Sequence, residues 1–167
     1  MLSFSDDYFI GFTEGEGCFY VGVVASNDTT NKWQIVHFFK VSQNPSGKVV
    51  LDAFKKRLNC GYVKRNDTST SSDNSLAYVV RDLVSLRDRV IPFFADKLVI
   101  KRRDFEVFKL VIDKISAKEH LTKQGFKELV DIIYANAHIV RKYSKEEILK
   151  KIPTDYTPDP DHKSGKI

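Results

Sequence analysis

Two stretches near the start of the chain are rich in β-branched and aromatic residues, as strands are. CFYVGVVAS (18–26) and WQIVHFFKVSQ (33–43) are separated by the turn-like NDTTNK, and together they predict a long hairpin. A second hairpin is predicted where the polar loop NDTSTSSDN joins GYVKR (61–65) to SLAYVVR (75–81). The four segments are expected to form one antiparallel sheet.

Apolar residues at helical spacing predict helices before, between and after the hairpins. The first, residues 3–15, begins at a Ser/Asp cap and places Tyr8, Gly11, Phe12 and Gly15 on one face. Further helices are predicted at 44–58, 83–94, 102–115, 122–137 and 144–152. The order α-β-β-α-β-β-α, with extra C-terminal helices, predicts an α+β fold in which helices cover one face of a four-stranded antiparallel sheet.

Length and composition fit one globular domain, predicted over residues 1–152, followed by a Pro-rich tail, 153–167, that is expected on the surface or disordered. The 42% apolar content excludes a disordered chain, and no apolar run is long enough for a membrane span. With no secretory signal at the N-terminus, an intracellular protein is expected. Two cysteines and four scattered histidines argue against a disulfide framework or a zinc site.

The chain carries a net charge of +5, and the basic excess lies in its second half. A pI near 9.1 is compatible with a polyanionic partner, although solvated lysine faces give the same balance.

The sequence Gly11-Phe12-Thr13-Glu14-Gly15-Glu16-Gly17 puts two carboxylates at the end of the first predicted helix. A helix C-terminus carries partial negative charge, so acids there are unfavourable by a few tenths to about 1 kcal/mol. A divalent cation would remove this penalty, because carboxylate and carbonyl oxygens are ligands that Mg²⁺ prefers. The alternative is a solvated acidic turn. Gly17 is expected to permit the change from helix to strand.

Residues 9–17 resemble the LAGLIDADG motif of homing endonucleases, with Glu in place of Asp at both acidic positions. Segments 39–43, 58–63, 92–94 and 101–105 also resemble their equivalents in that family in order and spacing, and the resemblance covers roughly residues 5–150. A chain with one motif resembles the homodimeric members. The resemblance implies a saddle-like sheet, DNA as substrate and a divalent metal, Mg²⁺ or alternatively Mn²⁺.

Carried onto this chain, the motif makes Glu16 the metal-binding carboxylate, with the Gly15 carbonyl beside it. Gln43 matches a residue that orders water near the metals, and Lys101 matches a basic residue that polarises this water. Glu14 matches the first acidic position, which lies nearer the structural turn.

Two positions leave alternatives open. Lys97 or Arg102 could take the place of Lys101, because the segment before residue 104 differs in length from some relatives. A further basic residue that often follows the Gln has no clean match here, since Gly47 falls at that place and Lys48 lies beside it.

In the family the motif helix packs through small residues against a second copy, which assigns the dimer interface to Phe9, Gly11, Phe12 and Gly15. A C2 homodimer implies a near-palindromic target. The sheet is expected to lie in the major groove, with Tyr20, Gln34, Lys40, Lys64, Asn66 and Asn74 facing the DNA. Val24, Val36, Phe38 and Leu76 share that face, either as contacts to thymine methyl groups or because the register is one residue out.

The predicted function is metal-dependent double-strand cleavage by an intron-encoded homing endonuclease. The alternative is a nucleic-acid-binding protein on the same fold that does not cut, such as an RNA maturase with its host intron RNA as partner. No membrane partner is expected, and the compartment would be an organelle or the bacterial cytoplasm. A basic interaction module without DNA leaves the acidic turn unexplained.

Overall fold

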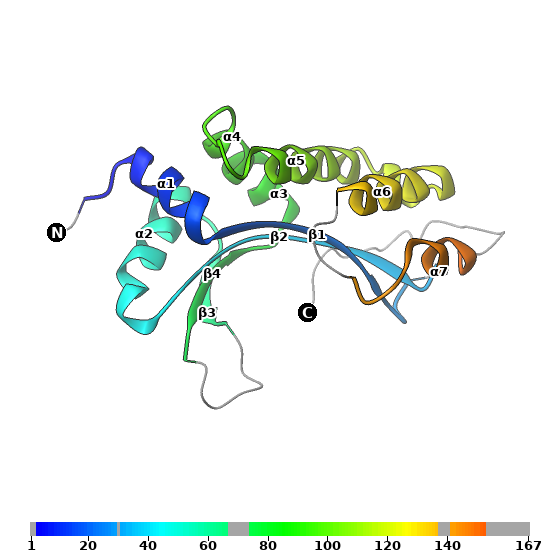
Figure 1. Cartoon of the computed structure of the whole chain (residues 1–167), viewed down its shortest axis with the longest axis horizontal. Coiled ribbons are helices and arrows are strands. Elements are labelled where there is room, and N and C mark those ends of the chain that lie inside the picture. Colours follow the sequence, from blue (N-terminus) through cyan, green and yellow to red (C-terminus); the bar gives the residue numbers. More distant parts are fainter. Residues whose placement is uncertain (1–2, 30, 67–73, 137–140, 153–167) are drawn as a thin grey trace. The chain divides into compact units, whose positions relative to one another are not determined.

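The computed structural model describes residues 3–29, 31–66, 74–136 and 141–152. The predicted tail, 153–167, lies outside the described residues. The elements, in chain order, are α1 (Asp6–Glu16), β1 (Gly17–Ala25), β2 (Trp33–Gln43), η1 (Pro45–Gly47), α2 (Lys48–Leu58), β3 (Tyr62–Arg65), β4 (Leu76–Val80), α3 (Leu83–Ser85), η2 (Leu86–Val90), α4 (Ile91–Phe94), α5 (Arg102–Ser116), η3 (Glu119–Leu121), α6 (Lys123–Ala135) and α7 (Lys145–Lys150) (Figure 1).

The four strands form one sheet in the order β1-β2-β4-β3. β4 pairs antiparallel with β2, where Phe39 lies opposite Val80, and with β3, where Tyr62 lies opposite Val79. The second hairpin therefore adds to the first through β4, and the predicted α+β fold is confirmed.

Contacts divide the chain into two compact units, residues 1–20 with 38–105 and residues 21–37 with 106–167. β1, β2 and α5 each contribute residues to both units. The prediction of a single domain over 1–152 stays a prediction.

The core of the first unit is aromatic. Phe39 of β2 is fully buried, with its ring centroid 5.0 Å from that of Phe19 and 5.2 Å from that of Phe94. On the same face, Phe54 of α2 stacks on Tyr78 of β4 at 5.9 Å. Helices α2 and α4 thus cover one face of the sheet in this unit through aromatic contacts.

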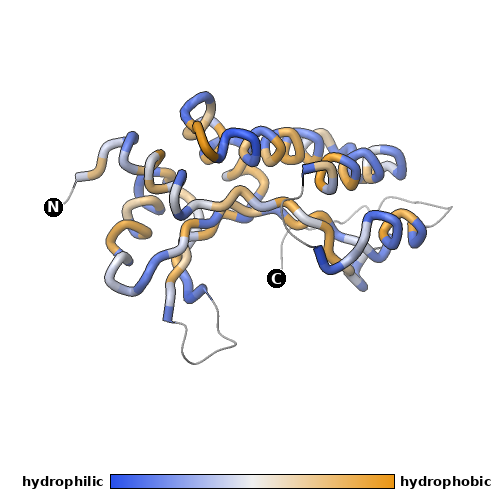
Figure 2. The backbone as a smooth tube through the Cα atoms, viewed as in Figure 1, coloured by the Kyte–Doolittle hydropathy of each residue, from blue (hydrophilic) through white to orange (hydrophobic). Residues whose placement is uncertain are grey.

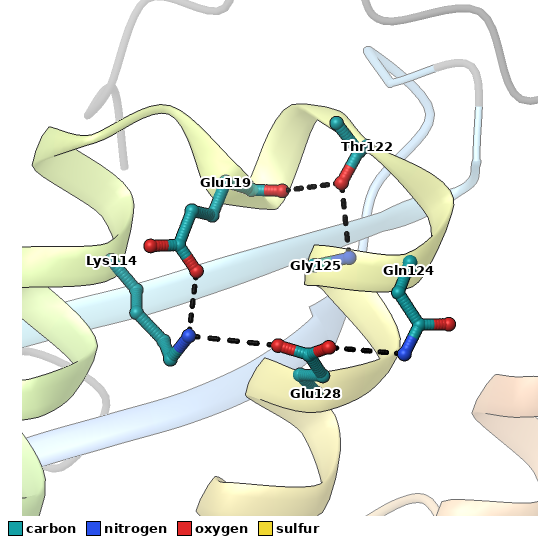
Figure 3. A network of polar contacts seen from close by, with 6 residues as sticks. All are labelled: Lys114, Glu119, Thr122, Gln124, Gly125 and Glu128. Carbon is teal, nitrogen blue, oxygen red and sulfur yellow. Dashed lines mark hydrogen bonds and ion pairs between the residues drawn. The ribbon is translucent and has the colours of Figure 1, made fainter.

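The second unit is held by an apolar helix core and a polar corner. Apolar stretches recur along α5 and α6 in Figure 2, in keeping with buried residues such as Phe108, Ile112 and Leu129. Where α5 meets η3, the Nζ atom of Lys114 lies 2.6 Å from a Glu119 carboxylate oxygen and 3.6 Å from one of Glu128 (Figure 3). In the same network, Thr122 caps α6 by accepting the Gly125 N–H at 3.0 Å.

The predicted helix 83–94 contains a π-helical turn, η2, between α3 and α4. Pro92 has no N–H and so cannot donate to the carbonyl four residues earlier. Next to it, the Ile91 N–H donates to Leu86 O, five residues back, which widens the helix at this point. The pattern of apolar residues is the same for an α-turn and a π-turn, so the sequence did not reveal this widening.

Gly17 is required by close packing rather than by its backbone angles. Its φ of −82° and ψ of 158° are open to any residue. A Cβ at this position would lie 2.5 Å from Thr13 Cγ2 and 2.7 Å from Thr13 O. The expectation that Gly17 permits the change from helix to strand therefore holds for a steric reason, because β1 leaves α1 directly over Thr13.

Replacing Gly17 with Ala is expected to lower the free energy of unfolding by about 1–3 kcal/mol, because an added methyl group in a filled space forces the backbone to shift. Urea unfolding measures the change, and Gly17→Ser should cost at least as much. An unchanged unfolding midpoint in both variants would contradict this account.

Candidate functional site

The acidic residues of α1 lie where the sequence placed them, at its C-terminal end. The helix starts at Ser5, whose Oγ accepts the Tyr8 N–H at 3.2 Å, and Asp6 and Asp7 occupy its first turn. No basic residue lies in the last turn, so Glu14 and Glu16 face the negative end of the helix dipole uncompensated from within α1.

The carboxylate of Glu14 binds the backbone that leads into α5. It accepts N–H groups from three successive residues, Val99, Ile100 and Lys101, the last two at 3.0 Å. Helix α5 begins one residue later, so Glu14 supplies negative charge where the dipole of that helix is positive. Glu14 is thus a capping group for a distant helix, a role that pattern alone did not indicate.

This contact also fixes where Lys101 lies. Its backbone is held by Glu14, two residues from Glu16 along α1. Burial raises the pKa of the Cys18 thiol, while the charges of Lys40 and Lys101 offset part of that rise, which places both cations near the start of β1. Of the two alternatives to Lys101, Lys97 is engaged elsewhere: its Nζ donates to Phe93 O at 2.9 Å.

Glu16 and Gly15 are exposed at the end of α1. Their carboxylate and carbonyl oxygens are of the kind that a hard divalent cation binds. Across the described ranges, no group of three or more His, Cys, Asp or Glu residues is arranged to hold a metal. One chain thus offers a fitting but incomplete set of donors, since such a cation takes six or more oxygen ligands.

Gln43 ends β2, and its side chain lies against the chain that follows. Its Oε1 accepts the Asn44 N–H at 3.1 Å. A Cβ on Gly47 would lie 3.0 Å from both Cγ and Oε1 of Gln43, so the glycine leaves room for this glutamine. Lys48 pairs with Asp52 at 2.6 Å. Position 47 therefore carries no basic side chain, and the absence of a side chain there leaves room for Gln43.

The less buried face of β1 and β2 carries the positions that the predicted register assigned to DNA. Along β2 the odd positions from Trp33 to Val41 are buried, and the even ones, including Gln34 and Lys40, are partly exposed; Tyr20 of β1 is partly exposed as well. Gln34 belongs to the second unit and the other two residues to the first.

Three residues of the first unit stack on one another on this face. The ring of Tyr20 lies 4.7 Å from that of Phe38, at an interplanar angle of 13°. The Arg81 guanidinium carbon lies 5.3 Å from the Phe38 centroid. We call Tyr20, Phe38 and Arg81 the stacked triad. Phe38 therefore supports a cation, which explains an apolar residue on a polar face.

The remaining predicted DNA contacts gather around β3. Lys40 Nζ donates to Asn66 Oδ1 at 3.2 Å, and Arg65 Nη2 donates to Asn74 Oδ1 at 2.8 Å across the base of the second hairpin. Lys64 is exposed.

Arg65 lies opposite Leu76, which lies opposite Gln43, so these residues share the face of Val41 and not that of Lys40. The expectation that Leu76 shares the DNA face is therefore wrong.

The predicted dimer interface needs one correction. Phe9 is 3% exposed, and its ring lies 4.8 Å from that of Phe54, so its side chain belongs to the core of its own unit. Gly11 and Gly15 are exposed, and a Cβ on either would meet nothing within 4 Å. Phe12 is half-buried, with its ring 6.1 Å from Phe54.

Comparison with known proteins gives consistent matches. The model of the LAGLIDADG endonuclease family matches residues 9–112. An uncharacterized 50.9 kDa protein in ND4 intron 1 of Podospora anserina is 33% identical over 73% of this chain, which spans only 27% of that relative's length. The homing endonuclease I-ApeII of Aeropyrum pernix is 28% identical, over 93% of this chain and 94% of its own.

Among solved structures, the archaeal intron-encoded homing endonuclease I-Vdi141I, complexed with DNA, superposes with a TM-score of 0.78 at 27% identity. The match covers 87% of this chain and 92% of that one.

Removing the Glu14 carboxylate is expected to destabilise the protein and loosen the start of α5. Glu14→Ala should lower the free energy of unfolding by about 0.5–2 kcal/mol, because three backbone N–H groups ahead of α5 lose their acceptor. The amides of residues 99–101 should exchange faster with solvent.

Glu16→Ala is the matched control, since it removes an equal charge from the same helix end. Its unfolding free energy should change by less than about 0.5 kcal/mol. Equal losses in the two variants would show that charge, and not the three hydrogen bonds, accounts for the effect.

Proposed function

The chain belongs to the LAGLIDADG endonuclease family, and from that membership we propose that it is an intron-homing type of DNA endonuclease that cuts both strands of a long, near-palindromic site as a homodimer. The observation that carries this proposal is the exposed carboxylate of Glu16 at the end of α1, beside a lysine backbone that Glu14 holds in place. A protein that only bound DNA would gain nothing from a carboxylate facing a phosphate.

Dimerisation is supported by the incomplete donor set. The open positions at Gly11 and Gly15 leave room for another backbone to approach α1 closely, with Phe12 beside them. A two-fold axis along this face would bring Glu16 of a second copy close to Glu16 of the first. The dimer would then have one active site for each strand of the duplex. Two half-sites of opposite polarity are what a C2 dimer recognises.

The proposed chemistry is hydrolysis of a phosphodiester. A bound Mg²⁺ or Mn²⁺ ion supplies activation of water and neutralises charge on the phosphate. Glu16 and the Gly15 carbonyl would hold that ion. Lys101 contributes positive charge beside the water that attacks, and Gln43 orders water through its amide. Glu14 acts indirectly, since it positions Lys101 through the backbone.

DNA is proposed to bind on the less buried face of the sheet. The stacked triad, the Lys40–Asn66 pair and Lys64 place cations and amides there, Gln34 extends the polar positions along β2, and Asn74 is a proposed contact from the base of the second hairpin. Lysine and arginine on this surface would contact phosphates and guanine edges, while the amides would read adenine. Binding should therefore weaken steeply as salt increases.

A non-cleaving nucleic-acid-binding protein, such as an RNA maturase that binds its host intron RNA, is the second candidate. It is favoured by Gly47, which leaves no basic side chain after Gln43, and by the Lys48–Asp52 ion pair.

No helix in the part of the chain that the structure describes meets the length and hydropathy needed to cross a membrane. For either candidate, we propose an organelle or the bacterial cytoplasm as the compartment.

Glu16→Gln is expected to retain specific DNA binding and to lose cleavage by at least about 100-fold, because a metal contributes several kcal/mol to such reactions. Cutting of an intron-insertion-site duplex library by the purified protein, with Mg²⁺ and with EDTA, measures this. Asp7→Asn, which removes a carboxylate from the other end of α1, is the control and should cut normally. Full activity of the Glu16 variant would refute the site, and specific binding without cutting by the unaltered protein would favour the second candidate.

Gly11→Leu is expected to convert the dimer to monomers without unfolding the chain. The new side chain meets nothing in its own protomer, but it would separate two α1 helices packed closely together. Sedimentation velocity would report the change in mass, and double-strand cleavage should be lost with it. A stable dimer in this variant would place the interface elsewhere.

A further inference from the structure

Away from the acidic turn and the sheet, residues of the first unit line an open surface pocket of about 340 Å³. Arg57 and Leu58 of α2, Arg89 of η2, Pro92 and Phe93 of α4, and Lys97 line it. We call it the Arg57 pocket. Three of its six lining residues are cations, and the proposed DNA face uses none of them.

Two of these cations share one aromatic ring. The guanidinium carbon of Arg57 lies 4.9 Å from the Phe93 centroid, and Lys97 Nζ lies 5.1 Å from it. Phe93 itself is 7% exposed, so the ring forms an apolar floor beneath two like charges. Cation–π contact stabilises each cation, and a further anion placed between them would be attracted by both charges.

Asp6 orients Arg57 without neutralising the pocket. Its two carboxylate oxygens accept Nε and Nη2 of Arg57, both at 2.7 Å, and this pairing lowers the pKa of Asp6. One edge of the guanidinium is occupied in this way, while its Nη1 group retains two donors. The Lys97 ammonium uses one donor on Phe93 O and retains two more. The three lining cations and the Asp6 carboxylate together carry a charge of +2.

The third cation comes from the π-helical turn. Such turns are rare and occur frequently at functional sites. Arg87 and Arg89 both belong to η2, but Arg87 is paired with Asp88, 2.6 Å from Nε to Oδ1, and does not line the pocket. Arg89, in contrast, is exposed and lines the Arg57 pocket. The turn therefore presents one arginine to the pocket and leaves the other in a local ion pair.

We propose that the Arg57 pocket is a second anion site, which binds a phosphate group of a nucleotide or polynucleotide. A tetrahedral oxyanion can accept from several donors at once, and guanidinium groups match it in geometry and charge. The aromatic floor suits the sugar or base that follows a phosphate. This inference does not depend on the proposed nuclease activity, since the pocket shares no residue with the Glu16 site.

Titration of the protein with inorganic pyrophosphate, in the absence of divalent metal, tests the proposal. NMR signals of the Arg57 Nε–H and of the Phe93 ring should shift on binding. Arg89→Gln should weaken the affinity about tenfold or more, as expected for loss of a charge-assisted contact. Arg87→Gln is the matched control, because it removes the same charge from the same turn, and it should change affinity by less than about twofold.

A single-stranded 12-mer without terminal phosphates identifies the source of the phosphate. If the 12-mer shifts the same signals and pyrophosphate reverses the shift, a polynucleotide backbone is the ligand. If pyrophosphate alone shifts them, the ligand is a free or nucleotide phosphate; both results support the site. The proposal is overturned if pyrophosphate at about 10 mM shifts neither signal, or if the two arginine variants weaken binding equally.

Discussion

The contact on which the candidate site depends is the one between the Glu14 carboxylate and three consecutive backbone N–H groups ahead of α5. It joins residues more than eighty positions apart in the chain. It also explains why an acid is tolerated at the negative end of the α1 dipole, because the same Glu14 carboxylate lies at the positive end of the α5 dipole. The position of Lys101 near the acidic turn follows from this one capping interaction.

Glu14 and Glu16 show how two like residues acquire different tasks from their surroundings. The Glu14 carboxylate accepts hydrogen bonds from backbone N–H groups, whereas Glu16 is exposed at the same helix end. Gly17 follows immediately, and its closeness to Thr13 makes the chain leave the helix there. Glu14 and the proposed reactive residue Glu16 lie within three residues of each other. Their roles differ because their side chains leave α1 in different directions.

Much of the fold could be predicted from the sequence, because periodicity reports burial directly. The strand predicted at 33–43 matches β2 in full, and the register carried over from the family places Gln34 and Lys40 on its less buried face, as the structure does. Features set by contacts distant in sequence could not be predicted this way. The π-turn before Pro92 has the same apolar pattern as an α-turn, and Phe9 looks like an interface residue until Phe54 is placed beside it.

In the candidate site, too, some features could be predicted from the sequence, and others depend on contacts between residues that are distant in sequence. Residue type and spacing pointed to the acidic turn that contains Glu16, whereas Gln43 and Lys101 followed only from the resemblance to the LAGLIDADG family, and the roles of all three stay predictions. The space that Gly47 leaves for Gln43 required coordinates, as did the partner of Arg65. Local sequence can indicate that a residue is unusual, whereas only tertiary structure shows what it touches.

The stacked triad bears on how a new target sequence could be selected for this protein. Tyr20 lies in β1, Phe38 in β2 and Arg81 directly after β4, and both Tyr20 and Arg81 stack on the Phe38 ring. If DNA lies on this face, these positions do not read neighbouring bases independently, and libraries that vary one position at a time would sample mostly incompatible neighbours. Reprogramming would have to treat the three residues as a single module and randomise them together.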